Sequence, residues 1–174
     1  MTEVEEFLAA HGATGLDHPG GTLLAHLRRT RDTLEAWGAR PSLCLAGLAH
    51  AAYGTDGFPH PLVDLTGRPA LTELIGAEAE SIVYTYGSCD RGHSYPLLAA
   101  GTPRFRDRFT GTERTPAPAE LRDFVELTIA NELDVLSHNE DLLAEHGAAL
   151  HNLFTAWRVH ASDQANAAVD GFFP

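Results

Sequence analysis

The sequence predicts an all-α protein, a bundle of helices, and three features of the chain lead to this fold class. Apolar residues recur at spacings of three and four along most of the chain, which is the period of an amphipathic helix. Proline and glycine stand where these periodic stretches begin and end. The two-residue alternation of a half-buried β-strand is not found in any convincing form along the 174 residues.

The first half of the chain holds the clearest helical patterns. Its expected helices cover residues 3–10, 22–38, 43–53 and 68–87, the last as one or two pieces joined near Gly76. The second of them carries a stripe of residues at helical spacing: Leu23, Leu27, Thr30, Leu34 and Trp37. The third, LCLAGLAHAAY, has no charged side chain and is apolar on every side, which predicts a central, buried helix.

The second half of the chain is expected to alternate between irregular segments and helices. Residues 55–67 and 88–96 are predicted loops, and residues 101–118 form a longer irregular segment. A long helix is expected over 119–137, followed by one or two helices over 140–169. One domain over residues 1–174 is the simplest organisation, because a chain of this length buries roughly two-thirds of its unfolded surface.

Charge and composition argue against several classes of function. The chain has 24 Asp and Glu against 12 Arg and Lys, and its formal net charge of −12 disfavours nucleic acids and anionic membranes as partners. No apolar run approaches the ~20 residues that cross a bilayer, and the acidic N-terminus does not resemble a secretory signal. We therefore expect a cytoplasmic protein, in which Cys44 and Cys89 are reduced thiols.

Three polar residues on the predicted inner faces of helices form the candidate site. His26 lies on the apolar stripe of its helix, His50 lies within the apolar stretch around it, and Asp134 lies in the long late helix. Burying such groups unpaired is costly, and a shared Fe, Mn or Zn ion satisfies imidazole nitrogen and carboxylate oxygen together. Each residue alone also has an ordinary structural interpretation, as a hydrogen-bonded core histidine or as an aspartate paired with an arginine.

Several short segments follow one another in an order that a known family shares. A histidine at position 26 is followed 24 positions later by another in AGLAHA, then by LIGAEAESIV, and then by an aspartate in ANELDVL. Over roughly residues 20–138 this order resembles the HD-domain superfamily, which contains all-α metal-dependent phosphohydrolases and some di-iron oxygenases. The nearest similarity is to the hydrolase domain of the stringent-response alarmone enzymes, which cleave pyrophosphate from guanosine tetraphosphate. The chain also contains the form AGLxHxxYGTxxF of some uncharacterised HD-like proteins.

The resemblance implies an HD-like helical bundle that binds a divalent metal through His26, His50 and Asp134. It also implies hydrolysis of a phosphate ester or anhydride in a small polar or anionic metabolite. The sequence departs from the superfamily at Ala51, where the His–Asp pair has its bridging aspartate. With two histidines and one carboxylate remaining, one metal ion is favoured over two, unless a nearby Asp or His replaces the missing ligand.

Further residues are expected to line the site. Beside the two histidines, Asp56 is the third predicted catalytic residue and acts as general base. Arg68 and Arg91 stand beside loops, where a planar guanidinium can clamp a phosphate or carboxylate, and Tyr53 is the other predicted substrate-binding residue. His18, in DHPGG, is expected near the mouth of the site, since these glycines let backbone approach closely. Each arginine also fits a solvated or structural role.

Other functions stay open at the level of the sequence. Two histidines and one carboxylate also suit a mononuclear non-haem iron centre for oxidation. Without metal, the two histidines suit an acid–base pair for a lyase, isomerase or cyclase step, and the missing aspartate also fits a catalytically inactive module that binds a ligand or a protein. The expected partner is a small-molecule substrate, while apolar residues near the end fit either the core or a homodimer seam: Leu150, Leu153, Phe154 and Trp157.

Overall fold

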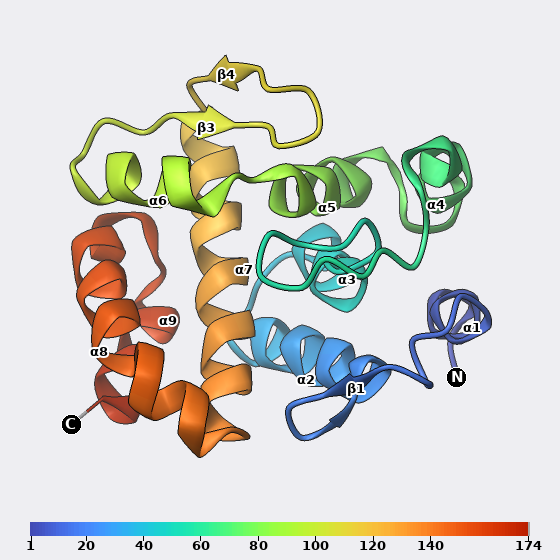
Figure 1. The fold of residues 1–174 in the computed structure, drawn as a ribbon, viewed down its shortest axis with the longest axis horizontal. Coiled ribbons are helices and arrows are strands. Elements are labelled where there is room, and N and C mark those ends of the chain that lie inside the picture. The colour runs from blue at the N-terminus through green and yellow to red at the C-terminus, as the bar shows by residue number, and fades with distance from the viewer. Residues whose placement is uncertain (174) are drawn as a thin grey trace. The chain divides into compact units, whose positions relative to one another are not determined.

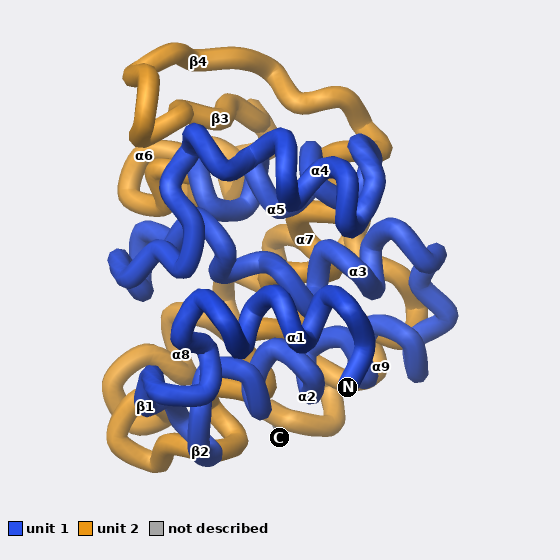
Figure 2. Tube along the Cα trace, turned by 90° about the vertical axis from the view of Figure 1, so that its right-hand side faces the viewer, with its two compact units in different colours: residues 1–88 blue, residues 89–174 orange. Residues whose placement is uncertain are grey.

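The protein is α-helical, as its sequence predicts. The computed structural model describes residues 1–173, and these contain nine α-helices, two short 3-10 helices and four strands of two residues each (Figure 1). Two compact units are present, Met1–Ser88 and a second one that begins at Cys89, and Figure 2 colours them separately. Among residues 1–173, no helix combines the length and the apolar composition that spanning a membrane requires. The HD-like form of the fold remains a prediction, as does a single domain over the whole chain.

The first unit is built around one central helix that packs against two others. Its α-helices are α1 (Glu3–Ala10), α2 (Leu23–Ala36), α3 (Pro41–Ala49), α4 (Arg68–Ile75) and α5 (Ala77–Ser88). Its short elements are the antiparallel strands β1 (Asp17–His18) and β2 (Gly21–Thr22) and the 3-10 turn η1 (Leu65–Gly67). Helix α3 packs against both α2 and α5, and α4 packs against α5. Fully buried leucines fill the core: Leu8, Leu23, Leu27, Leu34, Leu48 and Leu71.

The second unit is arranged around one long helix. Its α-helices are α6 (Arg91–Ala99), α7 (Pro118–Ser137), α8 (Glu140–Trp157) and α9 (Asp163–Phe172), and its short elements are β3 (Phe105–Arg106), β4 (Glu113–Arg114) and η2 (Arg158–His160). Helix α8 runs alongside α7 (Figure 1), and α9 also packs against α7. The core is aromatic, since Phe124 and Trp157 contact each other and both contact Tyr95. Phe154 and Trp157 are buried there, so these two side chains belong to the core, one of the two places that the sequence left open beside a homodimer seam.

Local sequence explains where the helices of the first unit begin. The Thr2 hydroxyl accepts a hydrogen bond from the Glu5 N–H, while the Glu5 carboxylate accepts from the Thr2 N–H, so α1 starts in a complete capping box. The Thr22 hydroxyl caps α2 by accepting from the Ala25 N–H. Helix α3 starts with Pro41 in its first turn, where a missing N–H costs nothing.

Two predicted boundaries are wrong. Residues 88–96 were expected to form a loop, but α6 begins at Arg91, because the Asp90 side chain accepts from the His93 N–H and caps the helix. The helix expected over 43–53 is shorter at its end. It stops at Ala49, so His50 is its C-terminal cap residue rather than an interior one.

The irregular segments also contain more pairing than the sequence indicates. The hairpins β1–β2 and β3–β4 pair antiparallel over only two residues each, too short for a two-residue alternation to be visible. In β1–β2 the turn residue Gly20 and the first residue of β2, Gly21, have φ values of 78° and 127°, a region that glycine enters without steric cost. This hairpin leads directly into α2.

Helices α1 and α2 are joined by a buried carboxylate. Glu5, on α1, accepts from Arg28 Nε at 2.9 Å and from Arg31 Nη1 at 3.3 Å, both on α2. The hydrogen bond from Arg28, with a smaller contribution from the Thr2 N–H, lowers the pKa of Glu5 to about 2. Glu5 therefore stabilises the folded state as a carboxylate.

Replacing Glu5 with Gln is expected to remove part of the acid sensitivity of the fold. Because the pKa of Glu5 is lower in the folded state, its contribution is complete above about pH 4.5 and is lost as the pH falls towards 2. The variant should lose on the order of 2–3 kcal/mol at neutral pH and less in acid, measured by urea unfolding across this pH range. Glu3→Gln, an exposed change in the same helical turn, is the control. Parallel pH profiles for wild type and Glu5→Gln would contradict the assignment.

Candidate functional site

Helices α2 and α3 bring the two predicted histidines into contact. His26 lies on the buried face of α2, and none of its surface is exposed. His50, at the C-terminal end of α3, is 2 % exposed. Their Nε2 atoms are 3.3 Å apart, although the two residues are separated by 24 positions in the chain. The sequence prediction that these imidazoles meet is therefore confirmed.

Gly47 allows this approach. A Cβ atom at position 47 would lie 2.6 Å from Leu34 Cδ1 and 3.5 Å from Arg31 Cα, both on α2. Leu34 is fully buried, so its side chain has little room to move away. The absence of a side chain at Gly47 thus lets α3 pack closely against α2, one turn from His50.

The Gly47 carbonyl also fixes the hydrogen positions in the histidine pair. It lies 2.8 Å from His50 Nδ1, and because a carbonyl oxygen only accepts, that nitrogen carries a hydrogen. In neutral His50 the Nε2 atom is then an acceptor. A hydrogen bond between the two Nε2 atoms consequently requires that His26 Nε2 be the donor.

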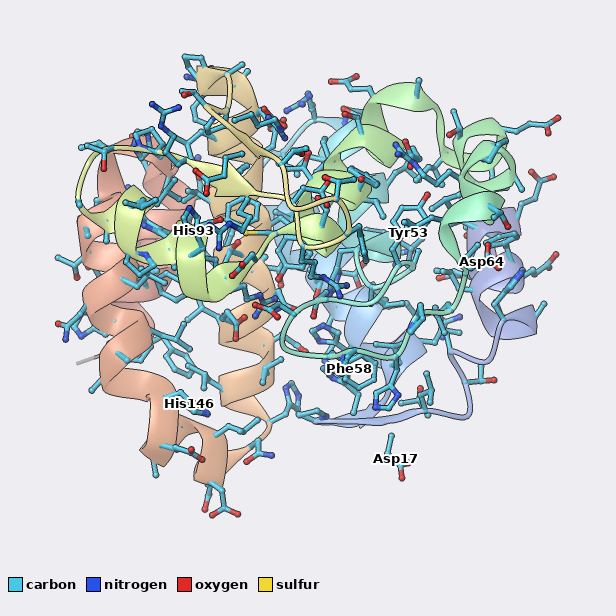
Figure 3. All side chains as sticks on the ribbon, turned by 45° about the horizontal axis from the view of Figure 1, so that its top comes forward. Asp17, Tyr53, Phe58, Asp64, His93 and His146 are labelled. Carbon is cyan, nitrogen blue, oxygen red and sulfur yellow. The ribbon has the colours of Figure 1, made fainter. Side chains whose placement is uncertain are left out.

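Further aromatic rings continue from the histidine pair on both sides. The His18 ring stacks on His26 with a centroid distance of 4.1 Å, and Phe58 meets His18 edge to face at 5.4 Å. On the other side, Tyr86 of α5 meets His50 edge to face at 5.3 Å. We call these five side chains the ring row; its inner members are buried, while His18 and Phe58, the latter labelled in Figure 3, are half-buried.

Tyr53 and Arg68, two predicted substrate-binding residues, converge on one buried carboxylate. Arg68 forms a bidentate ion pair with Glu80, donating through Nε at 2.7 Å and through Nη2 at 2.9 Å. The Tyr53 hydroxyl donates to the same carboxylate at 2.8 Å, and Arg68 also lies over the Tyr84 ring. Burial, and then the hydrogen bond to Glu80, raise the pKa of Tyr53 above its ordinary value. The group ties the turn after α3 to α4 and α5. A substrate contact for Tyr53 (labelled in Figure 3) or for Arg68 remains a prediction.

The other predicted site residues lie in different surroundings. Asp56 is exposed in the tight turn between Thr55 and Phe58, whose backbones bond to each other. Arg91, at the start of α6, donates to Glu132 of α7 at 2.9 Å, within the second unit. Neither observation tests the catalytic or substrate-binding role that the sequence predicts for these residues.

Asp134, the predicted third metal ligand, belongs to the second unit. It is a largely buried residue of α7, and its backbone carbonyl lies 2.8 Å from His138 Nδ1. Within residues 1–173, no three His, Cys, Asp or Glu side chains are already grouped as ligands of one ion. The metal site, and the place of Asp134 in it, therefore stay predictions, with the two imidazoles as the part that the structure brings together.

Sequence reasoning missed two residues that shape this region. Tyr86 covers His50, and its spacing of three from Val83, which is fully buried, could have placed it on the inner face of α5. Glu80 lies on the same face, again three positions from Val83, but a glutamate gives no sign of burial until its partner is known. The partner of Glu80 comes from another helix, which sequence spacing does not reveal.

Comparison with known proteins adds one finding. Residues 7–91 match the model of a family that is described as a domain of unknown function (DUF6817). The matched segment is a little less than half of the chain and includes the whole ring row and the Glu80 group. No curated protein and no solved structure matches the chain.

Gly47→Ala is expected to destabilise the fold by about 1–3 kcal/mol, because the added methyl group overpacks the contact between α2 and α3. Urea unfolding at neutral pH measures this loss. Gly171→Ala is the matched control, since Gly171 also lies in a helix but a Cβ atom added there would meet no other atom within 4 Å. That control should gain up to about 1 kcal/mol from helix propensity. Equal stability of Gly47→Ala and wild type would show that the helices are not held at this distance by glycine.

Arg68→Ala is expected to leave Glu80 as a buried carboxylate whose negative charge is no longer balanced by Arg68. We expect a loss of about 1–3 kcal/mol, below the range for fully buried pairs because the Arg68 side chain is 37 % exposed. Adding Glu80→Gln to Arg68→Ala should restore part of the loss, because a neutral amide is less costly to bury than a charge. A double-mutant cycle in urea isolates this coupling. Additive losses would argue against the ion pair as a stabilising contact.

Proposed function

We propose that this protein is a small HD-like enzyme that uses a divalent metal ion for phosphohydrolase-type chemistry on a small polar or anionic metabolite. One contact supports this function above all others: the Nε2 atoms of two buried histidines, His26 and His50, face each other at 3.3 Å. The HD resemblance implies these two residues as ligands of one ion, and they come from successive helices that pack together.

Distances within the pair suit two ligands of a common ion. Two nitrogens that each lie about 2.0–2.1 Å from a tetrahedral Zn²⁺ are about 3.3–3.4 Å apart, and the centroids of their rings are then about 5.2 Å apart. The ring centroids of His26 and His50 are 5.2 Å apart. The bond between His50 Nδ1–H and the Gly47 carbonyl also has the form of the outer contacts that orient metal-binding histidines.

An Fe, Mn or Zn ion bound by this pair would supply Lewis-acid activation of water and neutralise phosphate charge. Its protein ligands would be His26 and His50, with Asp134 as the third ligand that the sequence predicts. Asp56 is the proposed general base, and Arg91 the proposed contact to an anionic substrate. Enclosure of the two imidazoles keeps them out of bulk water, which strengthens their interaction with a cation.

Iron-dependent oxidation is a second chemistry for the same ion. It is favoured by Ala51, which is buried at 2 % exposure and brings no ligand atom to the position of the bridging aspartate. A set of two histidines and one carboxylate around a single ion leaves coordination positions open, as in non-haem iron enzymes. Identification of the bound metal distinguishes these two chemistries.

A metal-free function is favoured by a different observation. The two imidazoles already satisfy each other with one hydrogen bond, and among residues 1–173 no three potential ligands are grouped around one point. His26 and His50 would then act as acid and base in a lyase, isomerase or cyclase step. A catalytically inactive binding module is the remaining alternative; it is favoured by the pairing of Arg68 with Glu80 inside the protein.

Purified protein is expected to contain close to one Fe, Mn or Zn ion per chain, measured by elemental analysis. His50→Ala and His50→Gln should both lose the ion, because each removes one of the two nitrogens that face it. The Ala variant also opens a cavity, which costs about 1–3 kcal/mol of stability. The Gln variant fills more of this space, so that a loss of metal by this variant is not simply a loss of folding. Release of phosphate from generic phosphate esters by the loaded wild type, and not by these variants, would support hydrolysis.

His146→Ala is the control for metal binding, because His146 is a largely exposed histidine on α8. It should retain the ion at the wild-type level. Wild-type protein without metal, even after reconstitution with each of the three ions, would count against the metal-dependent function and in favour of the acid–base or binding-module alternatives.

A further inference from the structure

His18, like His50, is an imidazole in direct ring contact with His26. It is the second residue of β1, and its backbone pairs with Gly21 across the hairpin. Its ring is half-buried and lies between the face of His26 and the edge of Phe58. Three imidazoles from β1, α2 and α3 therefore form one continuous cluster within the first unit.

The backbone beneath His18 is held firmly to α2. Arg29 of α2 donates to the carbonyls of Pro19 at 3.0 Å and Gly20 at 3.3 Å, which closes the hairpin turn onto the helix. The Leu23 N–H donates to the Leu16 carbonyl at 2.8 Å on the other side of the hairpin. Because the backbone is fixed at both points, the position of the His18 ring is set by rotation of its own side chain.

The distance from His18 to His26 is close to that of two ligands on one ion. Ring centroids of two histidine ligands lie about 4.5 Å apart at a 90° ligand angle and about 5.2 Å apart at the tetrahedral angle. The observed separation of 4.1 Å is a stacked arrangement, shorter than the first value by about 0.4 Å and than the second by about 1.1 Å. A displacement of the His18 ring by roughly 1 Å, together with a rotation that turns a nitrogen towards the ion, would reach the tetrahedral separation.

We propose that His18 is the third imidazole of the site, so that His18, His26 and His50 together bind a divalent transition metal through three nitrogens. This role rests on the proposed metal-dependent function and replaces the predicted third ligand, Asp134, with one from the first unit. His18 stacks on His26 in the structure, and among residues 1–173 no three potential ligands are grouped around one point. To bind an ion together with His26 and His50, the His18 ring would leave the stack and turn a nitrogen towards the ion, and water or substrate could then supply a further ligand.

An all-nitrogen set has consequences for the choice of metal. Three neutral imidazoles suit Zn²⁺, Co²⁺, Ni²⁺ or Cu²⁺, whereas hard oxygen-preferring ions such as Mg²⁺ and Ca²⁺ prefer carboxylates and water. The site therefore should select against Mg²⁺ even when Mg²⁺ is in large excess. The net charge of the bound site would remain +2, which suits an anionic substrate.

The test uses Co²⁺ as a spectroscopic probe, titrated into the full chain after removal of metal with a chelator. His18→Phe keeps an aromatic ring to stack on His26 but has no nitrogen. His60→Phe is the matched control, because His60 is exposed and contacts Phe58, the outer member of the ring row. We expect His18→Phe to weaken Co²⁺ binding at least tenfold and to change its visible absorption bands, while His60→Phe binds as wild type does. His18→Asp, which offers an oxygen ligand, should recover part of the affinity.

The outcomes separate this inference from the function on which it rests. If wild type binds Co²⁺, His50→Ala does not, and His18→Phe binds with unchanged affinity and spectrum, the role of His18 is overturned while the metal-dependent function stands. In that case Asp134→Asn, rather than His18→Phe, is expected to weaken Co²⁺ binding. If wild type binds no Co²⁺, both are overturned. Thermal unfolding of each variant checks that it is folded, and a misfolded His18→Phe is replaced by His18→Leu, to which the same criteria apply.

Discussion

The close packing of α2 against α3 is the constraint on which the candidate site depends. It is possible because Gly47 has no side chain, and a single added carbon there would lie 2.6 Å from a buried leucine. The same residue offers its carbonyl to His50 Nδ1 and so determines which nitrogen of that ring faces His26. One glycine therefore sets both the spacing of the two helices and the orientation of one of the two imidazoles between them.

The buried glutamates and histidines of the first unit fall into two kinds. Glu5 and Glu80 each meet arginine, and their charge is balanced within the fold. His26 and His50 meet each other instead, and two like groups are satisfied only by a shared hydrogen or by a cation between them. Structural ion pairs of the first kind stabilise the unit, whereas a pair of the second kind is suited to accept an ion or a proton, which is why function is proposed there.

The segment that matches the family model contains this pair. The matched residues, 7–91, run from α1 into the start of α6 and take in almost the whole first unit. The histidine pair, the hairpin with His18 and the Glu80 group all lie in that segment. A metal site made of three histidines would thus be contained in one compact unit, and the activity proposed for it would not depend on a carboxylate elsewhere.

Helical periodicity and local caps made most of the fold predictable from the sequence. Residues 22–38 and 119–137 have one apolar face each, and the corresponding helices α2 and α7 form within a few residues of the expected bounds. The prediction of a loop over residues 88–96 was wrong. Gly92 and Pro96 are typical of loops, but the Asp90 side chain accepts a hydrogen bond from the His93 N–H and so caps α6. The contact between His26 and His50 was predicted because both rings lie on apolar faces of successive helices.

The sequence by itself determined that this is a helical protein with histidines enclosed among apolar residues, since both properties follow from the spacing of side chains along a single helix. Only the tertiary structure decided that Arg68 meets Glu80 and that His18 stacks on His26. These contacts join segments whose approach depends on how whole helices and a hairpin pack. Spacing along the chain carries no information about that packing, because it describes one element at a time.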